Sequence, residues 1–399
     1  MIHVPFDKID ETTIQQLVDN EVAEIKTLDY KRDLPGGGDE AKREFLADVT
    51  SFANASGGHI VFGVEEKKGA PIAANGVTCD DPDATISWLE SVVREGIAPR
   101  IPNLKTKAIT GFDKGPVFVM EIPKSWVGPH MVSFNKSSRF YTRTSNGKSL
   151  LDVQEIRNAF LATESQGERI RNFIMERIAN IMGDETPVPL SSPQRLVLHL
   201  IPLPSFLNRE RLALNNAKPA LNAFSPLGSR GCDHRWNVDG YLNFRTLSNE
   251  DRKSKGYCQL FFDGAVENVW ADVLQQIPHD VPGTSPNFIA SVAYEKYCIE
   301  ATATHLKGYQ QLGLEPPFIV FLALLNCEGA YMSVRMCDEP GNPIDRKVVR
   351  APEVFVDSIE CDFDALAAIL KPAFDAVWNA CGFASSHNYN NEGNWDPPP

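Results

Sequence analysis

The sequence predicts an α+β protein built from two domains. Its 399 residues, 43% of them hydrophobic, are more than one hydrophobic core usually supports. Helical and strand-like patterns occur in both halves of the chain. A segment rich in Gly, Pro and Ser at 183–193 is the predicted linker between them. We therefore expect domains at 1–182 and 194–381, and a disordered tail at 382–399, where Ser, Asn and Pro replace apolar residues.

The first domain is predicted to open with a helix, a strand and a second helix. Asp10 is a candidate N-cap for a helix over 10–20, which carries Ile14 and Leu17 on one face. Residues 28–32 alternate between apolar and charged side chains, as a strand does. After a glycine-rich turn, apolar residues at helical spacing predict a helix over 39–54.

The rest of the first domain alternates in the same way. An apolar run predicts a buried strand at 59–64, and an apolar stripe predicts a helix at 85–98. Further strands are expected at 105–110, 117–122 and 140–143, the first two joined as a hairpin. A helix over 151–182, broken near Ser165-Gln-Gly167, completes the domain.

The second domain has fewer unambiguous elements. A strand at 195–200 opens it, and residues 259–267 form the clearest hairpin signal, two apolar runs around an Asp-Gly turn. A long helix is predicted at 285–312, and a buried strand at 318–325.

Composition excludes some functional classes. The chain has 39 basic and 52 acidic residues, a net charge of −13, so a basic coat for nonspecific nucleic-acid binding is absent. The N-terminus lacks the pattern of a signal peptide, and the longest apolar run, 318–325, is far below the ~18 residues of a membrane span. The eight cysteines are scattered along the chain, as is typical of reduced thiols. We expect a soluble cytoplasmic protein that does not engage membranes.

One segment departs from the overall acidity. Residues 94–148 carry ten basic and three acidic side chains, a net charge of +7, which leaves −20 on the rest of the chain. Such a segment could neutralise several phosphates of a nucleic acid. The alternative is that its lysines guard exposed strand edges against aggregation.

Three acidic residues of the first domain are candidates for a metal site. Glu24 precedes the first predicted strand, Asp29 lies on its polar face, and Glu65, beside Glu66, follows the 59–64 strand. If the two strands are neighbours, these carboxylates converge, and clustered carboxylates are stable when a cation compensates them. Oxygen ligands favour Mg²⁺ or Mn²⁺. The alternative is three unrelated surface acids.

Lys31 strengthens the metal-site hypothesis. It follows Asp29 by two residues on the same strand face, about 7 Å away. A metal ligand and a fixed positive charge at that spacing suit phosphodiester cleavage, because the lysine can stabilise charge that develops on the phosphate. In an exposed strand the same pattern is often a solvated charge pair.

These residues also resemble a known family. Glu24-Ile-Lys-Thr-Leu28-Asp29-Tyr30-Lys31 is followed by Phe52-Ala-Asn-Ala-Ser-Gly57-Gly58 and by Gly63-Val64-Glu65. Together they resemble the Schlafen-type AlbA domain, whose pattern is an acid, four residues, acid–aromatic–Lys, then Phe-Ala-Asn-x-x-Gly-Gly and Gly-Val-acid. Pro129-His130 and Tyr141-x-Arg143 resemble its later blocks. The resemblance covers roughly residues 18–162 and implies a mixed sheet with packed helices.

The resemblance implies a metal-dependent endoribonuclease acting on tRNA or similar structured RNA. The family's three acids correspond to Glu24, Asp29 and Glu65, which would be both the catalytic residues and the ligands of Mg²⁺ or Mn²⁺, with Lys31 supporting the phosphate. Asp29 departs from the more usual Glu, which shortens that ligand by one methylene. It remains open whether Glu65 or Glu66 is the third ligand, although the family's spacing fits Glu65. The expected RNA contacts are Lys26, Arg32, His130, Arg139 and Arg143.

Other readings of the resemblance remain open. Many bacterial members are described only as DNA-binding or ATP-binding modules of regulators, so a non-catalytic DNA- or RNA-binding regulator is the main alternative, and an interaction module with a degenerate site is another. Animal Schlafens place two such domains in one chain to form an RNA clamp; this chain has one, so a homodimer would be needed to rebuild the clamp. Prokaryotic relatives are associated with defence against phage, and the second domain would then sense a phage or host trigger.

Overall fold

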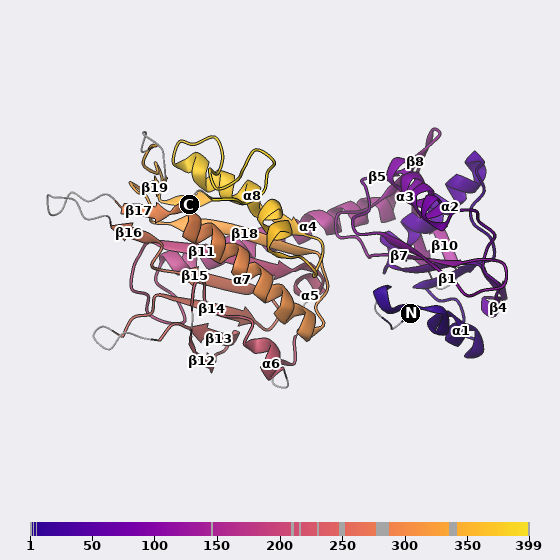
Figure 1. Cartoon of the computed structure of the whole chain (residues 1–399), viewed down its shortest axis with the longest axis horizontal. Coiled ribbons are helices and arrows are strands. Elements are labelled where there is room, and N and C mark those ends of the chain that lie inside the picture. The colour runs from indigo at the N-terminus through magenta and orange to yellow at the C-terminus, as the bar shows by residue number, and fades with distance from the viewer. Residues whose placement is uncertain are drawn as a thin grey trace. The chain divides into compact units, whose positions relative to one another are not determined.

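The computed structural model describes residues 2, 4, 6–144, 147–208, 211–214, 217–229, 231–246, 252–276, 287–334 and 341–397. The chain divides into two compact units, Met1–Arg169 and Ile170–Pro399 (Figure 1). Both units combine helices with β-sheets, so the predicted α+β class is confirmed.

The first unit contains most of the predicted elements. Its helices and strands are η1 (Phe6–Lys8), α1 (Glu11–Asp19), β1 (Leu28–Lys31), α2 (Asp39–Ala53), β2 (Gly58–Phe62), β3 (Val64–Lys67), β4 (Ala70–Ala74), α3 (Pro82–Gly96), β5 (Ile97–Ala98), β6 (Lys105–Ile109), β7 (Val117–Ile122), β8 (Met131–Phe134), β9 (Ser137–Thr144), β10 (Gly147–Leu150) and the first part of α4 (Val153–Met182). The short strands β4, β5, β8 and β10 were not predicted.

A mixed sheet with the strand order β1-β2-β7-β6 forms the centre of this unit. β1 and β2 are parallel, with Asp29 opposite Ile60, and α2 connects them. β7 runs antiparallel to both β2 and β6, which confirms the predicted hairpin. α2 and α3 cover one face of the sheet around Phe52 and Leu89, and α1 covers the other through Ile14.

α1 and α4 show how local capping decides where a helix begins. Asp10 caps α1, as predicted, by accepting the Thr13 N–H at 2.8 Å. Asp152 caps α4 in the same way by accepting the Glu155 N–H at 2.8 Å. The predicted break near residues 165–167 is wrong: α4 is continuous, because one glycine inside a helix costs only about 1 kcal/mol relative to alanine.

The second unit is built on an eight-stranded sheet with the order β12-β13-β14-β15-β11-β18-β20, in which β21 also pairs with β18. Its elements are β11 (Arg195–Pro202), α5 (Leu203–Asn208), α6 (Lys218–Leu221), β12 (Asp233–Trp236), β13 (Gly240–Phe244), β14 (Gly256–Phe261), β15 (Val266–Trp270), β16 (Leu274–Gln276), β17 (Asn287–Ala290), α7 (Ser291–Leu312), β18 (Phe318–Leu325), β19 (Tyr331–Ser333), β20 (Val348–Arg350), β21 (Val354–Val356) and α8 (Phe363–Ala380). β14 and β15 form the predicted hairpin.

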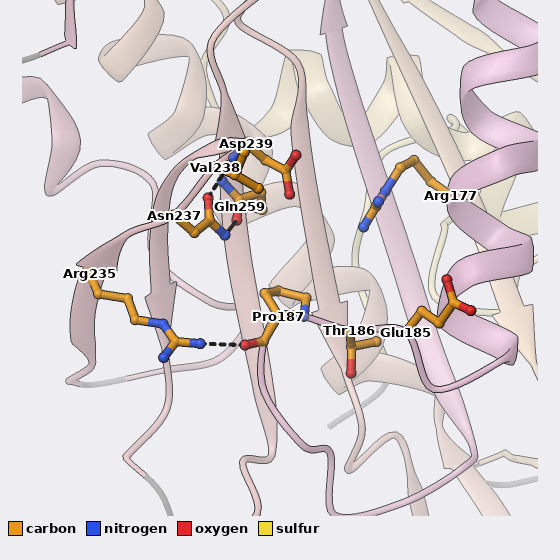
Figure 2. A pocket seen from close by; sticks show the side chains of 9 residues that line it. All are labelled: Arg177, Glu185, Thr186, Pro187, Arg235, Asn237, Val238, Asp239 and Gln259. Atoms are coloured by element: carbon orange, nitrogen blue, oxygen red, sulfur yellow. Dashed lines mark hydrogen bonds between the residues drawn. The ribbon is translucent and has the colours of Figure 1, made fainter.

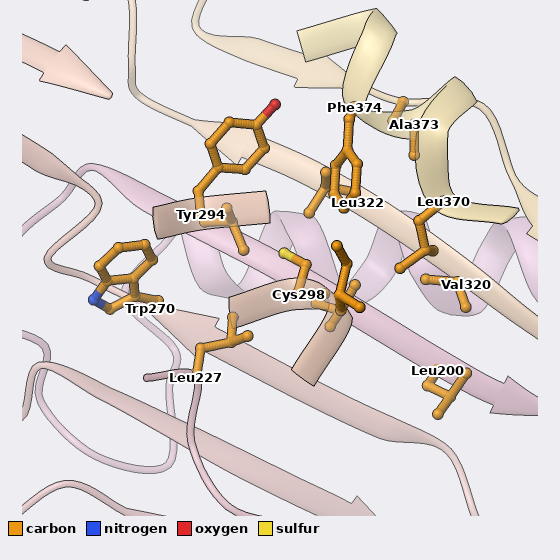
Figure 3. Packing of buried hydrophobic residues seen from close by; sticks show 14 of the residues in the cluster. Leu200, Leu227, Trp270, Tyr294, Cys298, Val320, Leu322, Leu370, Ala373 and Phe374 are labelled. Atoms are coloured by element: carbon orange, nitrogen blue, oxygen red, sulfur yellow. The ribbon is translucent and has the colours of Figure 1, made fainter. Parts of the chain in front are cut away.

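Two helices close one face of this sheet. Figure 3 shows Tyr294 and Cys298 of α7 and Phe374 of α8 beside Val320 and Leu322 of β18. α7 begins at Ser291 rather than at the predicted 285, because β17 precedes it; residues 285–286 lie outside the described part of the chain.

The predicted linker at 183–193 is not a free connection. Val188 and Leu190 are buried, and the Ser191 N–H donates to the Ser254 carbonyl at 2.9 Å. The boundary between the units falls inside α4 instead. Proline and glycine in this segment therefore shape a loop that belongs to the second unit.

The predicted disordered tail also differs from the structure, which describes it up to residue 397. The buried Glu295 carboxylate of α7 accepts hydrogen bonds from Ser386 Oγ (2.7 Å), Asn388 Nδ2 (2.9 Å) and Trp395 Nε1 (2.8 Å). Trp378 Nε1 of α8 donates to it as well, at 2.8 Å. Polar composition predicts disorder, but these polar side chains donate hydrogen bonds to one buried carboxyl group.

Within the described residues, no helix combines the length and the apolar character needed to cross a membrane.

Candidate functional site

The candidate site is a pair of carboxylates at β1. A tight turn, in which Ile25 and Leu28 exchange two backbone hydrogen bonds, leads into the strand. Glu24, just before this turn, lies alongside β1, and its Oε1 accepts the Tyr30 N–H at 2.9 Å. Burial raises the pKa of Glu24, and contact with the Asp29 carboxylate raises it further, against the opposing effect of the Tyr30 N–H. Nearby cations therefore do not offset the cost of ionising Glu24.

Asp29 is buried, with 5% of its surface exposed, and it is held by two cations. Lys31 Nζ lies 2.8 Å from Oδ2, and Arg143 Nη2 lies 2.9 Å from Oδ1. Burial alone would raise the pKa of Asp29, but these two partners outweigh burial and lower it. The two neighbouring carboxylates thus have pKa values shifted in opposite directions.

The ion pairs continue to Asp48, which sequence reasoning missed. Asp48 Oδ2 lies 3.4 Å from Lys31 Nζ, and its Oδ1 lies 2.9 Å from Lys148 Nζ. Asp48 is 6% exposed and lies among the buried residues of α2, between Phe45 and Phe52. An acid inside the apolar stripe of an amphipathic helix was the signal that could have found it.

Glu65 and Glu66 divide between two environments. The β3–β4 pairing is irregular between these residues, as in a β-bulge, which changes the local alternation of side chains. Glu65 lies 3.7 Å from Lys114 Nζ. Glu66 Oε2 accepts the Gly69 N–H at 2.6 Å, and its charge raises the pKa of Glu24. As the side chains lie, no group of three or more His, Cys, Asp or Glu in the described residues is placed to hold a metal ion.

The expected RNA contacts fall into two groups. Lys26, Arg32 and Arg139 are exposed, and Arg32 pairs with Asp33 at 2.9 Å. His130 and Arg143 are buried instead.

The buried positions of His130 and Arg143 correct the expectation that both face RNA. His130 Nδ1 lies 2.7 Å from the Pro99 carbonyl oxygen, and burial lowers its pKa. Arg143 pairs with Asp29, and its guanidinium lies over the Phe52 ring at 4.3 Å. His130 thus contacts backbone, and Arg143 is a buried counter-charge of Asp29.

The Phe-Ala-Asn-x-x-Gly-Gly segment, residues 52–58, connects parts of the first unit that are distant in sequence. Asn54 Nδ2 donates to the carbonyls of His130 and Tyr141, each at 2.8 Å, which ties the end of α2 to β9 and to the residue before β8. Gly58 has φ +148°, and a Cβ there would lie 2.3 Å from the Thr27 carbonyl oxygen. This glycine therefore lets β2 approach the turn that precedes β1.

The second unit has a pocket, whose lining residues are drawn in Figure 2, with a volume of about 300 Å³. Arg177 of α4 lines the pocket and donates two hydrogen bonds to the buried Glu267 carboxylate, at 2.8 and 2.9 Å. Burial would raise the pKa of Glu267, but Arg177 and His199 lower it to about 2. Arg177 is thus positioned by its hydrogen bonds to Glu267 of β15. Charged, polar and apolar residues line the pocket: Arg177, Glu185, Thr186, Pro187, Arg235, Asn237, Val238, Asp239 and Gln259.

Residues 24–152 match the family model described as Schlafen, AlbA_2. The N-terminal unit carries a Schlafen AlbA_2 domain. The match covers the acidic pair, Asp48, the Asn54 and glycine segment, and Arg143, so the resemblance predicted from the motifs is confirmed. It indicates a role in nucleic-acid biology.

Two further comparisons add little to this match. The chain is similar to the DIP2311 protein from Corynebacterium diphtheriae, with 18% identity and a TM-score of 0.26. That similarity covers 35% of this chain and 29% of the other, so the chain spans less than a third of that protein. No curated protein matches the chain.

Proposed function

We propose that the Schlafen AlbA_2 domain is a metal-dependent endoribonuclease that cleaves tRNA or a similarly structured RNA. The observation that carries this proposal is the pair of carboxylates, Glu24 and Asp29, whose pKa values are shifted in opposite directions. Such divergent pKa values within one cluster are common at catalytic sites. The domain's nucleic-acid role supplies the substrate class.

The donor set fits Mg²⁺ or Mn²⁺. Mg²⁺ is commonly bound by one or two protein carboxylates, keeps several waters, and also binds substrate phosphates. Glu24 and Asp29 would be its first ligands, and Glu65 would be the third after its side chain turns from Lys114, with Glu66 as the alternative. When bound, the ion would stabilise negative charge on the phosphate and lower the pKa of a bound water.

Lys31 is suited to the phosphate itself. Its ammonium group has three N–H donors and forms ion pairs with Asp29 and Asp48. Its side chain is 38% exposed, so its ammonium group can also reach a phosphate oxygen. Lys26, Arg32 and Arg139, all exposed, would bind the RNA backbone further out.

The test is cleavage of total tRNA by the purified full-length chain in Mg²⁺, in Mn²⁺ and in EDTA. Glu24→Gln and Asp29→Asn should each abolish metal-dependent cleavage, whereas Glu40→Gln, at an exposed acid in the first turn of α2, should leave it unchanged. Comparing Glu65→Gln with Glu66→Gln identifies the third ligand. Cleavage that survives both Glu24→Gln and Asp29→Asn would remove this site assignment.

A non-catalytic DNA- or RNA-binding regulator is the second candidate, and one observation favours it. Asp29 already has two cationic partners, and the described side chains offer no ready three-acid metal site. RNA or DNA binding with no cleavage in either metal, at high protein concentration, would select this candidate.

Four broader proposals accompany the nuclease. The protein would act in the cytoplasm as a homodimer. A mass measurement in solution at micromolar concentration tests the homodimer directly. It would take part in defence against phage, and its second unit would sense a phage or host trigger. Comparing phage growth in cells that express the wild type or Glu24→Gln tests the defence role; equal growth would count against it.

A further inference from the structure

Two loops of the first unit approach Gly57 and Gly58. The first is the turn at residues 25–28, and the second is the segment that follows β7, residues 123–130. A Cβ on Gly58 would lie 2.3 Å from the Thr27 carbonyl oxygen, in the turn that presents Lys26. A Cβ on Gly57, where φ is +68°, would lie 2.5 Å from the Lys124 backbone nitrogen. Only residues without a side chain allow both loops to approach this closely.

The backbone of the second loop is hydrogen-bonded to the protein, while some of its side chains are exposed to solvent. The Ser125 N–H donates to the Ala53 carbonyl at 3.0 Å, which holds the loop to the end of α2. Lys124 Nζ lies 4.1 Å from the centre of the half-buried Trp126 ring. Val127 is 44% exposed, and Ile25 on the first loop is 45% exposed.

The surface formed by Lys26, Lys124 and Trp126, called the patch below, thus combines two ammonium groups with an aromatic ring. Burial lowers the pKa of Lys124, and the charge of Lys26 lowers it further, so the two cations lie close enough to repel each other. An anion between them would relieve that repulsion. A nucleic acid supplies phosphates for the lysines and a base for the ring, and it would meet local positive charge on a chain whose net charge is −13.

We propose that Lys26, Lys124 and Trp126 form a binding site for a single-stranded segment of RNA, with phosphates on the two lysines and a base stacked on the indole. The proposal rests on the proposed function for its ligand class, and it adds Lys124 and Trp126 to the residues expected to contact RNA. Lys26 follows Glu24 by two residues, so at most about 7 Å of chain separates their Cα atoms. RNA bound here would lead directly to the acidic pair.

The experiment measures binding of a fluorescein-labelled 12-nucleotide oligouridine to the full-length chain, by anisotropy in EDTA, over a range of salt concentrations. Lys26→Ala and Lys124→Ala should each reduce the slope of log affinity against log salt by about 0.7. Trp126→Ala should weaken binding about tenfold at every salt concentration without changing the slope, and Trp126→Phe should restore most of the affinity. Lys105→Ala, which removes an exposed charge from β6, is the matched control and should change the slope much less.

Several results would overturn the proposal: no binding by the wild type, patch variants that bind like the wild type, or a slope change for Lys105→Ala equal to that for Lys124→Ala. A parallel arm uses vesicles of phosphatidylserine and phosphatidylcholine, because lysines beside exposed apolar residues also suit a membrane surface. Patch variants that lose vesicle binding but keep RNA binding would refute the RNA site. If the wild type binds RNA through this patch but cleaves nothing in Mg²⁺ or Mn²⁺, the site stands and the nuclease proposal fails.

Discussion

Replacing Arg143 by methionine tests whether the acidic pair depends on a buried counter-charge. The substitution removes the ion pair with Asp29 but keeps an apolar side chain over Phe52. Removing one partner of a buried pair costs about 3–5 kcal/mol. Because Lys31 remains 2.8 Å from Asp29, we expect the lower end, about 3 kcal/mol.

For a unit of this size, such a loss lowers the melting temperature by about 6–12 °C. The assay is thermal and urea unfolding followed by hydrogen exchange in β1 and β9, which assigns the loss to the first unit. Arg139→Met is the matched control, since Arg139 lies on the same strand but is exposed; it should change stability by no more than about 0.5 kcal/mol. Asp29→Asn and the double variant complete a cycle in which we expect about 1–3 kcal/mol of coupling between Asp29 and Arg143. Equal effects of Arg143→Met and Arg139→Met, or additive effects in the cycle, would refute the reasoning.

Three further predictions concern stability. Glu24→Gln should stabilise the metal-free protein by up to about 1 kcal/mol at pH 7, because a raised pKa means that the ionised form of Glu24 destabilises the fold. The gain in stability should vanish as the pH falls below 4.5, the ordinary pKa of a glutamate side chain. Urea unfolding at several pH values measures this gain, and a gain that does not change with pH would contradict the prediction. Asn54→Ala removes three hydrogen bonds to backbone groups and should cost the first unit about 2–4 kcal/mol in urea unfolding, so a loss within experimental error would deny Asn54 its cross-linking role. Glu295→Ala should speed hydrogen exchange throughout residues 382–397, whereas protection equal to the wild type would mean that the segment is held by other contacts.

The sequence was most informative where structure is local. Asp10 and the apolar stripe of residues 10–20 predicted α1, and the Asp-Gly turn predicted the β14–β15 hairpin. The pairing of Glu24 with Asp29 also followed from short spacing along one segment. In each case the residues that make the deciding contacts lie within a few positions of one another in the sequence, so a short segment is enough to predict them.

Burial set by distant segments could not be predicted in this way. Arg143 contacts Asp29 across 114 residues, and Asn54 contacts His130 across 76. A basic or aromatic side chain has the same appearance in a sequence whether it faces solvent or a buried acid. For that reason the sequence predicts one basic surface for residues 94–148, although Lys114, Arg143 and Lys148 are paired with acids.

The hydrogen bonds of Glu295 have a consequence for synthesis of the chain. Trp395, which donates to that carboxylate, lies 100 residues further along. At about 5–20 residues per second, roughly 5–20 s pass between translation of the acid and translation of this donor. During that interval residues 1–169 have already been synthesised and can fold, while the Glu295 carboxylate of α7 lacks hydrogen-bond donors that are still to be synthesised. The second unit therefore reaches its final packing only after Trp395 has been synthesised, and nascent chains that stop before this residue carry a first unit beside an unfinished second unit.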